Sequence, residues 1–243
     1  MADQAPYSST LAADAARVTE LAAIASYAGI GRGDEKAADQ LAVDAMRTAL
    51  NALAIDGKIV IGEGERDEAP MLYIGEKVGT GKGPAIDIAL DPLEGTTLTA
   101  KAMANALCVL AMSPGGGMLH APDTYMDKIA IGPGFKPGLV DLDMSPQDNV
   151  RALAGAKGVA TNEITVCVMD RPRHAELIAA LREVGAKVVL ITDGDVAGVI
   201  HTAEPETGID LYLGSGGAPE GVLAAAALKC VGGHFQGRLV FRN

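Results

Sequence analysis

Apolar and polar positions repeat with two different periods along the chain. Apolar side chains recur every three or four positions over residues 10–27 and 39–53, which predicts two helices with one buried face each. Short continuous apolar runs follow at residues 58–62, 85–90 and 107–112. Runs of this length between turn residues are typical of buried strands. The first half therefore predicts paired helices followed by a sheet.

A more regular alternation begins near residue 163. Apolar runs at residues 164–169, 187–191 and 209–213 are each followed by a helical pattern. Alternating strands and helices predict an α/β fold with a parallel sheet and right-handed crossovers. Ser145 and Pro146 precede a further predicted helix. We expect an approximate domain boundary near there, dividing the chain into domains 1–150 and 151–243.

Composition limits the protein's partners. The net charge of −11 over 243 residues works against binding to nucleic acid or anionic membranes. It also works against binding a phosphate ester, unless bound cations reverse the local sign. Neither a signal peptide nor a membrane-spanning apolar run is found, and the three cysteines are widely spaced. We therefore expect a cytoplasmic protein with free thiols.

The first candidate site follows the strand predicted at residues 85–90. Asp91 and Glu94 flank a proline, and Gly95 and Thr96 open the next predicted helix, over residues 96–106. Carboxylates beside the N–H groups of a helix N-terminus suit a hard divalent cation and a phosphate together. An acidic turn of this length alone is equally well explained as a solvated helix cap.

A second acidic cluster follows the strand predicted at residues 58–62. Glu63, Glu65, Asp67 and Glu68 lie within six residues and repel one another unless solvent or a cation intervenes. Glu63 is nearest the strand end and is the most rigidly aimed, whereas the other three are expected at the surface. Two such clusters after two strands favour a metal site.

Polar loops also follow the later strands, where open α/β sheets bind ligands. Arg171 and Arg173 can each donate two hydrogen bonds to a phosphate. The glycine-rich residues 214–221 lead to a helix and form a second candidate anion site. His174 is either a surface residue or part of a ligand loop, and Tyr125 is either a core-edge residue or a ligand contact.

Four long segments carry a family resemblance: residues 59–75, 91–96, 121–126 and 216–221. With them, the chain resembles the class II (GlpX-type) fructose-1,6-bisphosphatases, and residues 233–241 resemble the dual fructose-1,6-/sedoheptulose-1,7-bisphosphatase branch. The resemblance implies a layered αβαβα sugar-phosphatase fold of the lithium-sensitive superfamily. It also implies hydrolysis of the 1-phosphate of the sugar bisphosphate, in gluconeogenesis or the Calvin cycle, by a homo-oligomer (dimer or tetramer).

The resemblance also implies residue roles. Ligands of Mg²⁺ or Mn²⁺ would be Asp39, Glu63, Asp91, Glu94 and Glu220. Contacts of the sugar bisphosphate would be Glu94, Gly95, Thr96, Tyr125, Arg171, Pro172, Arg173, Asp193, Gly194, Asp195 and Gly217. Thr96, Glu63 and Asp91 would be catalytic. Asp39, which its position alone assigns to the dipole of a helix, becomes a metal ligand on this basis.

Two departures from the family pattern bear on function. A lysine near the metals, here Lys36, is displaced by one position. Family chains also continue past residue 243, so we expect the sheet of the second half to be incomplete. An inositol-type sugar monophosphatase and a truncated, non-catalytic chain that binds sugar phosphates or assembles with full-length subunits are the alternatives.

Overall fold

The computed structural model describes residues 9–64 and 71–241. Its contacts divide the chain into two compact units, Met1–His120 and Ala121–Asn243, called here the N-terminal and C-terminal units. Both are mixed α/β structures, and each is described by itself. No helix among the described residues has the length and apolar content needed to span a membrane.

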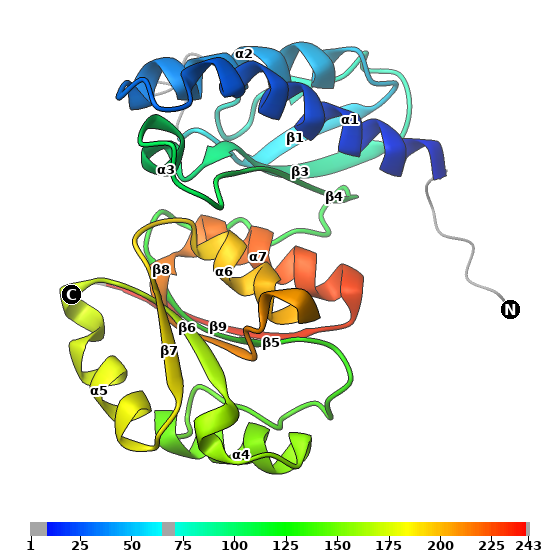
Figure 1. Ribbon diagram of the computed structural model, residues 1–243. Coiled ribbons are helices and arrows are strands. Elements are labelled where there is room, and N and C mark those ends of the chain that lie inside the picture. Colours follow the sequence, from blue (N-terminus) through cyan, green and yellow to red (C-terminus); the bar gives the residue numbers. More distant parts are fainter. Residues whose placement is uncertain (1–8, 65–70, 242–243) are drawn as a thin grey trace, which may run out of the picture. The chain divides into compact units, whose positions relative to one another are not determined.

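The N-terminal unit is a four-stranded mixed sheet covered by two long helices (Figure 1). Its elements in chain order are α1 (Ser9–Ser26), η1 (Tyr27–Gly29), α2 (Glu35–Asn51), β1 (Asp56–Ile61), β2 (Lys77–Val78), β3 (Ala85–Glu94), α3 (Thr96–Ala100) and β4 (Leu107–Pro114). The strand order is β2-β1-β3-β4; β1 and β3 are parallel, and the outer pairs are antiparallel.

The core of this unit lies between the helix pair and the sheet. Val18 and Ala22 of α1 and Met46 of α2 pack with the apolar side chains of β1 and β3, such as Ile59 and Ile88. The helix pattern of the sequence therefore predicted most of the buried face, although Leu41, one of its apolar positions on α2, is 39% exposed. Asp34 begins α2 by accepting a hydrogen bond from the N–H of Ala37, at 3.0 Å.

Two predictions in this unit were wrong. The strand does not stop before Pro92: β3 continues to Glu94, because its register with β4 shifts between Asp91 and Glu94 and no ladder hydrogen bond is required of the proline. The helix expected over residues 96–106 ends at Ala100, since Ala102 and Asn105 have positive φ angles of 54° and 77°.

The C-terminal unit is a five-stranded sheet with helices on both faces (Figure 1). Its elements are β5 (Tyr125–Ile131), α4 (Pro146–Lys157), η2 (Thr161–Glu163), β6 (Thr165–Met169), η3 (Pro172–His174), α5 (Ala175–Glu183), β7 (Lys187–Ile191), α6 (Asp195–Ile200), η4 (His201–Ala203), η5 (Pro205–Thr207), β8 (Leu211–Gly217), α7 (Ala218–Val231) and β9 (His234–Val240).

Strands β7, β6 and β8 are parallel, as predicted, and β5 and β9 add an antiparallel pair that was not predicted. Alternate residues of β6 face opposite layers: Val166 and Val168 pack toward α4 and α5, and Cys167 packs toward α6 and α7. Because β5 pairs with β8 and β9, residues from 121 onward belong to the C-terminal unit, and the contact boundary differs from the predicted one near residue 150.

The glycine-rich residues 214–221 are not a loop. Gly214 to Gly217 form the end of β8, and α7 begins directly afterwards at Ala218. In the register with β5, Gly217 lies opposite Tyr125 and Gly214 lies opposite Lys128. These glycines are therefore held in a sheet, where their small size matters more than their flexibility.

Candidate active site

The predicted ligands of the N-terminal unit lie at the ends of two neighbouring strands. Since β1 and β3 are parallel and adjacent, their carboxyl ends lie at one edge of the sheet. Glu63 follows β1 by two residues, and Asp91 and Glu94 lie in the last four residues of β3. Gly95, with a φ of 82°, then turns the chain into α3, whose first residue is Thr96.

Asp39 of α2 and Glu63 form a pair of carboxylates that repel each other. Burial raises the pKa of Glu63 to about 7, and the negative charge of Asp39 contributes to the rise. Burial also raises the pKa of Asp39. A divalent cation would offset both the burial and the repulsion, and carboxylate oxygens are the donors that Mg²⁺ and Mn²⁺ prefer.

The donor set therefore fits such a cation, although the pair alone does not complete a site. Among residues 9–64 and 71–241, no three Asp, Glu, His or Cys side chains converge closely enough to hold a metal ion. A cation at Asp39 and Glu63 would have to draw further oxygen ligands toward it.

The backbone of Glu63 is held by a strained segment. Its N–H donates to the carbonyl of Leu72 at 3.0 Å, and Leu72 is completely buried with a φ of 56°. The Glu76 carboxylate accepts hydrogen bonds from the Leu72 N–H at 2.5 Å and from Arg47 Nε at 2.7 Å. A Cβ atom at residue 62 would collide with the Leu72 carbonyl, so Gly62 permits this close approach. The buried Glu76 thus helps to fix the position of Glu63.

The remaining carboxylates of the acidic segment, Glu65, Asp67 and Glu68, were predicted at the surface and lie outside the described residues.

Asp91 and Glu94 differ in exposure at the end of β3: Asp91 is half-buried and Glu94 is buried. Asp91 accepts a hydrogen bond from the N–H of Leu93 at 3.0 Å, which orients its carboxylate within the bulge. Burial raises the pKa of the Cys108 thiol to about 11, against a hydrogen bond with Ser26, and the charge of Asp91 adds to the rise. Glu94 is only 5% exposed.

In the C-terminal unit, Glu220 lies in the first turn of α7, and one of its carboxylate oxygens makes no hydrogen bond in the described structure. This oxygen, Oε2, is buried. Burial raises the pKa of Glu220, a backbone hydrogen bond opposes the rise, and the charges of Asp195 and Asp123 add to it while Lys128 lowers it. An oxygen in this state is a suitable ligand for a cation.

Arg173 and Tyr125 are brought together at the ends of β6 and β5. The guanidinium lies over the Tyr125 ring, 5.0 Å from its centroid, and donates two hydrogen bonds to the Ser215 carbonyl, at 3.0 and 2.6 Å. Arg171 donates to the carbonyl of Asp170 at 3.2 Å, and Pro172 is exposed in η3. Arg173 thus has a fixed direction beside an aromatic surface.

The other predicted substrate contacts lie on two turns. Asp193 accepts a hydrogen bond from the N–H of Gly194, whose φ of 82° allows α6 to begin. Asp195, by contrast, is buried, and its carboxylate contacts the Lys128 ammonium. Gly217 lines an open cavity of about 500 Å³ with residues 123–125.

His174 is a structural bridge. Its ring is buried, with Nδ1 2.7 Å from the Met169 carbonyl and Nε2 accepting from the Ser215 N–H at 2.9 Å. Both ring nitrogens are therefore engaged by the ends of β6 and β8, which leaves neither for a ligand. The sequence left open a surface position or a ligand-loop role for His174, and the buried ring has neither.

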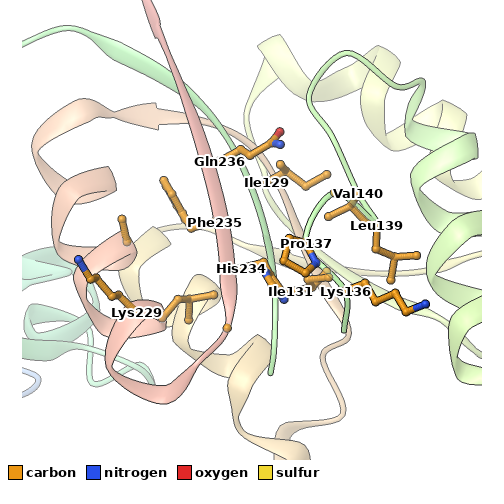
Figure 2. Close-up of a pocket in the computed structure, with 14 residues that line it drawn as sticks. Ile129, Ile131, Lys136, Pro137, Leu139, Val140, Lys229, His234, Phe235 and Gln236 are labelled. Atoms are coloured by element: carbon orange, nitrogen blue, oxygen red, sulfur yellow. The ribbon is translucent and has the colours of Figure 1, made fainter. Parts of the chain in front are cut away.

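Sequence reasoning missed Lys128 and Glu76, which are buried next to predicted site residues. The available signal was a charged side chain beside an apolar run, such as Lys128 before Ile129. A separate cavity of about 510 Å³ between β5, β9 and the chain at 136–140 contains none of the predicted residues (Figure 2). Its polar groups do not converge: Lys136 and Lys229 lie on opposite sides of it in Figure 2.

Carboxylates at the ends of neighbouring parallel strands can hold a catalytic divalent cation, and an arginine fixed after a strand of an α/β sheet can bind a phosphate, which fits the class of metal-dependent α/β phosphatases. Comparison with known proteins narrows this class. The family model "Bacterial fructose-1,6-bisphosphatase, glpX-encoded" matches residues 9–243. The chain belongs to this family, the class II fructose-1,6-bisphosphatases.

Two relatives illustrate the similarity. The chain is 53% identical over 233 residues to "Fructose-1,6-bisphosphatase 1 class 2" of Escherichia coli (strain K12), covering 96% of this chain and 69% of the relative. It is 49% identical over 233 residues to "Fructose-1,6-bisphosphatase class 2" of Haemophilus influenzae, covering 96% of this chain and 70% of the relative.

Proposed function

We propose that this chain is a metal-dependent phosphatase that releases the 1-phosphate of fructose 1,6-bisphosphate. The observation that carries the proposal is the half-buried, mutually repelling pair of Asp39, on α2, and Glu63, after β1, in a chain whose family relatives are named for this reaction. Without a cation, this pair disfavours the approach of a phosphate. With one, it attracts a phosphate.

The residues that would hold Mg²⁺ or Mn²⁺ are Asp39, Glu63, Asp91, Glu94 and Glu220. When bound, such an ion neutralises phosphate oxygens and lowers the pKa of a water molecule. Of the substrate contacts that the resemblance implies, Glu94, Gly95 and Thr96 belong to the N-terminal unit and the others to the C-terminal unit.

The chain's own groups would then orient the reactants. The Thr96 hydroxyl would orient the attacking water or its proton transfer, and a carboxylate or the metal would have to assist, because a hydroxyl is too weak an acid to act alone. Arg173, fixed by Tyr125 and the Ser215 carbonyl, holds the distal phosphate with Arg171. Asp193, Gly194 and Gly217, which lines the open cavity with residues 123–125, would contact the sugar phosphate.

A phosphate-release assay tests the proposal. Fructose 1,6-bisphosphate should yield phosphate with Mn²⁺ or Mg²⁺ and none with EDTA. Glu63→Ala and Asp91→Ala should each abolish release in a folded protein, whereas Asp14→Ala, an exposed acid on α1, should retain it. Near-normal turnover in the first two variants would contradict the site assignment.

The same assay separates the remaining alternatives. Sedoheptulose 1,7-bisphosphate tests the dual-activity branch, and inositol 1-phosphate tests the monophosphatase reading, which a paired Arg171 and Arg173 disfavours. Stabilisation by substrate and metal without release would indicate a binding chain. Inhibition by Li⁺ tests the lithium-sensitive superfamily, and light scattering tests the expected dimer or tetramer.

A further inference from the structure

Lys128 is a completely buried cation in the centre of the C-terminal unit. Its side chain is 0% exposed, and its Nζ lies 2.5 Å from Oδ2 of Asp195, which is itself buried at the start of α6. Buried ion pairs stabilise a fold little, because desolvation offsets the attraction between the charges. The Lys128–Asp195 pair therefore needs an explanation other than its contribution to stability.

The glycines of β8 and α7 provide the space around this pair. A Cβ atom at Gly216 would collide with the Asp195 carboxylate and would lie 3.2 Å from Lys128 Nζ. A Cβ at Gly221 would lie 3.2 Å from Lys128 Cε and 2.5 Å from the sulfur of Met126. The glycine-rich segment is therefore shaped to fit the ion pair.

Glu220 lies between these two glycines in the sequence. A Cβ atom at Gly217 would collide with the Glu220 Oε2 atom, so a third glycine makes room for this carboxylate. The Glu220 Oε2 remains without a hydrogen-bond partner in the described structure. Lys128 thus makes its direct contact with Asp195 and leaves the Glu220 carboxylate available.

We propose that Lys128 is a positioning residue: by binding Asp195 next to Gly216 and Gly221, it keeps Glu220 in place and available for the catalytic cation. This inference rests on the proposed function and deepens it. It gives the Asp195 carboxylate a supporting role in place of the substrate contact implied by the family resemblance.

The test compares Lys128→Met, Asp195→Asn and the control Lys229→Met, an exposed lysine on α7. The dissociation constant for Mn²⁺ alone is measured by calorimetry, and kcat and KM for fructose 1,6-bisphosphate are measured in parallel.

Loss of a residue that orients a metal ligand weakens metal binding or activity by about 10–100-fold. We expect that range for the Mn²⁺ affinity and kcat of Lys128→Met, a smaller loss for Asp195→Asn, and wild-type values for the control.

The outcomes separate the competing explanations. A folded Lys128→Met with an Mn²⁺ dissociation constant and kcat within twofold of wild type would overturn the inference. If Lys128→Met does not fold, Asp195→Asn decides: an Asp195 that only contacts substrate would raise KM and leave the Mn²⁺ dissociation constant unchanged, which also overturns it. Absence of phosphate release from the wild-type protein would instead contradict the proposed function.

Discussion

His174 joins two strands that no longer pair with each other. Ladder pairing between β6 and β8 ends at Cys167 and Tyr212, and the imidazole then connects the Met169 carbonyl to the Ser215 N–H. Since Nε2 accepts a hydrogen bond, Nδ1 carries the proton and the ring is neutral. The same Ser215 carries the carbonyl that holds Arg173, so the ring also supports the proposed phosphate contact.

This arrangement predicts that stability falls in mild acid. Burial lowers the pKa of His174 from 6.5, and the charges of Arg173 and Arg171 add to this effect. The two backbone hydrogen bonds oppose it. Below pH 6.5 the unfolded chain binds a proton that the folded ring resists, so the free energy of unfolding decreases as the pH falls toward the folded pKa. Above pH 6.5 this contribution is fully present.

Urea unfolding at pH 8 and pH 5.5 measures the effect. In His174→Gln, which has a donor and an acceptor but does not titrate, the difference between the two pH values should be smaller than in the wild type. His201→Gln should behave like the wild type. An unchanged difference in His174→Gln would show that other groups cause the pH dependence.

Cysteine reactivity offers a second prediction for individual residues. Burial, helped by the charge of Asp195, raises the pKa of Cys167 to about 12, and the pKa of Cys108 is about 11, so both thiols remain protonated and unreactive. Cys230 is exposed. Titration with a thiol reagent should modify Cys230 rapidly and the other two only on unfolding. Fast labelling of native Cys230→Ser would contradict this.

Single residues also mark the limit of sequence reasoning. The Ser145 and Asp148 cap of α4 could be predicted, because its partners are three positions apart. The role of Lys128 could not, because Asp195 lies 67 positions away and only the folded sheet brings the two together. Local signals are readable in a sequence, and long-range partners are not.

Among the elements, periodicity identified the parallel strands β6, β7 and β8 and the helices between them. It missed β5, since Asp127 and Lys128 interrupt the apolar run, and it misassigned Gly214 to Gly217 as a loop. In both cases a tertiary contact overrides the local preference: a buried ion pair satisfies Lys128, and the glycines give it space.

The buried Glu76 should stabilise the segment between β1 and β2. Glu76→Gln removes the charge that holds the strained Leu72 N–H and leaves Arg47 without its ion pair. We expect a loss of about 1–3 kcal/mol in the free energy of unfolding. Phosphate release per folded molecule should also fall, because the Leu72 carbonyl holds the N–H of Glu63.

Urea denaturation and the phosphate-release assay check both effects, with the exposed Glu206→Gln as the matched control. Loss of stability with fully retained release would mean that Glu76 supports the fold of the segment and has no influence on Glu63.

At the scale of the whole molecule, each unit has its own core, and most of the candidate metal ligands belong to one of them. Asp39, Glu63, Asp91 and Glu94 are in the N-terminal unit, and Glu220 is in the C-terminal unit. The sequence could predict that acidic residues follow several strands. It could not predict which are buried, and burial is what makes their charge unfavourable in the absence of a cation.

A carboxylate kept for metal binding should therefore reduce the stability of the metal-free protein. Glu63 has a pKa of about 7 because of burial and the charge of Asp39, so its ionised form is disfavoured in the fold at pH 8. Glu63→Gln removes this charge and should raise the free energy of unfolding of the metal-free protein by on the order of 1–3 kcal/mol.

In the wild type, Mn²⁺ at about 100 times its dissociation constant should add about 2.7 kcal/mol to the free energy of unfolding, and Glu63→Gln should lose most of that gain. Thermal melting at pH 8 with EDTA and with Mn²⁺ measures both changes, with Asp14→Asn as the control. If Glu63→Gln melts at a lower temperature than the wild type in EDTA and keeps the full Mn²⁺ shift, Glu63 is a structural residue and not a metal ligand.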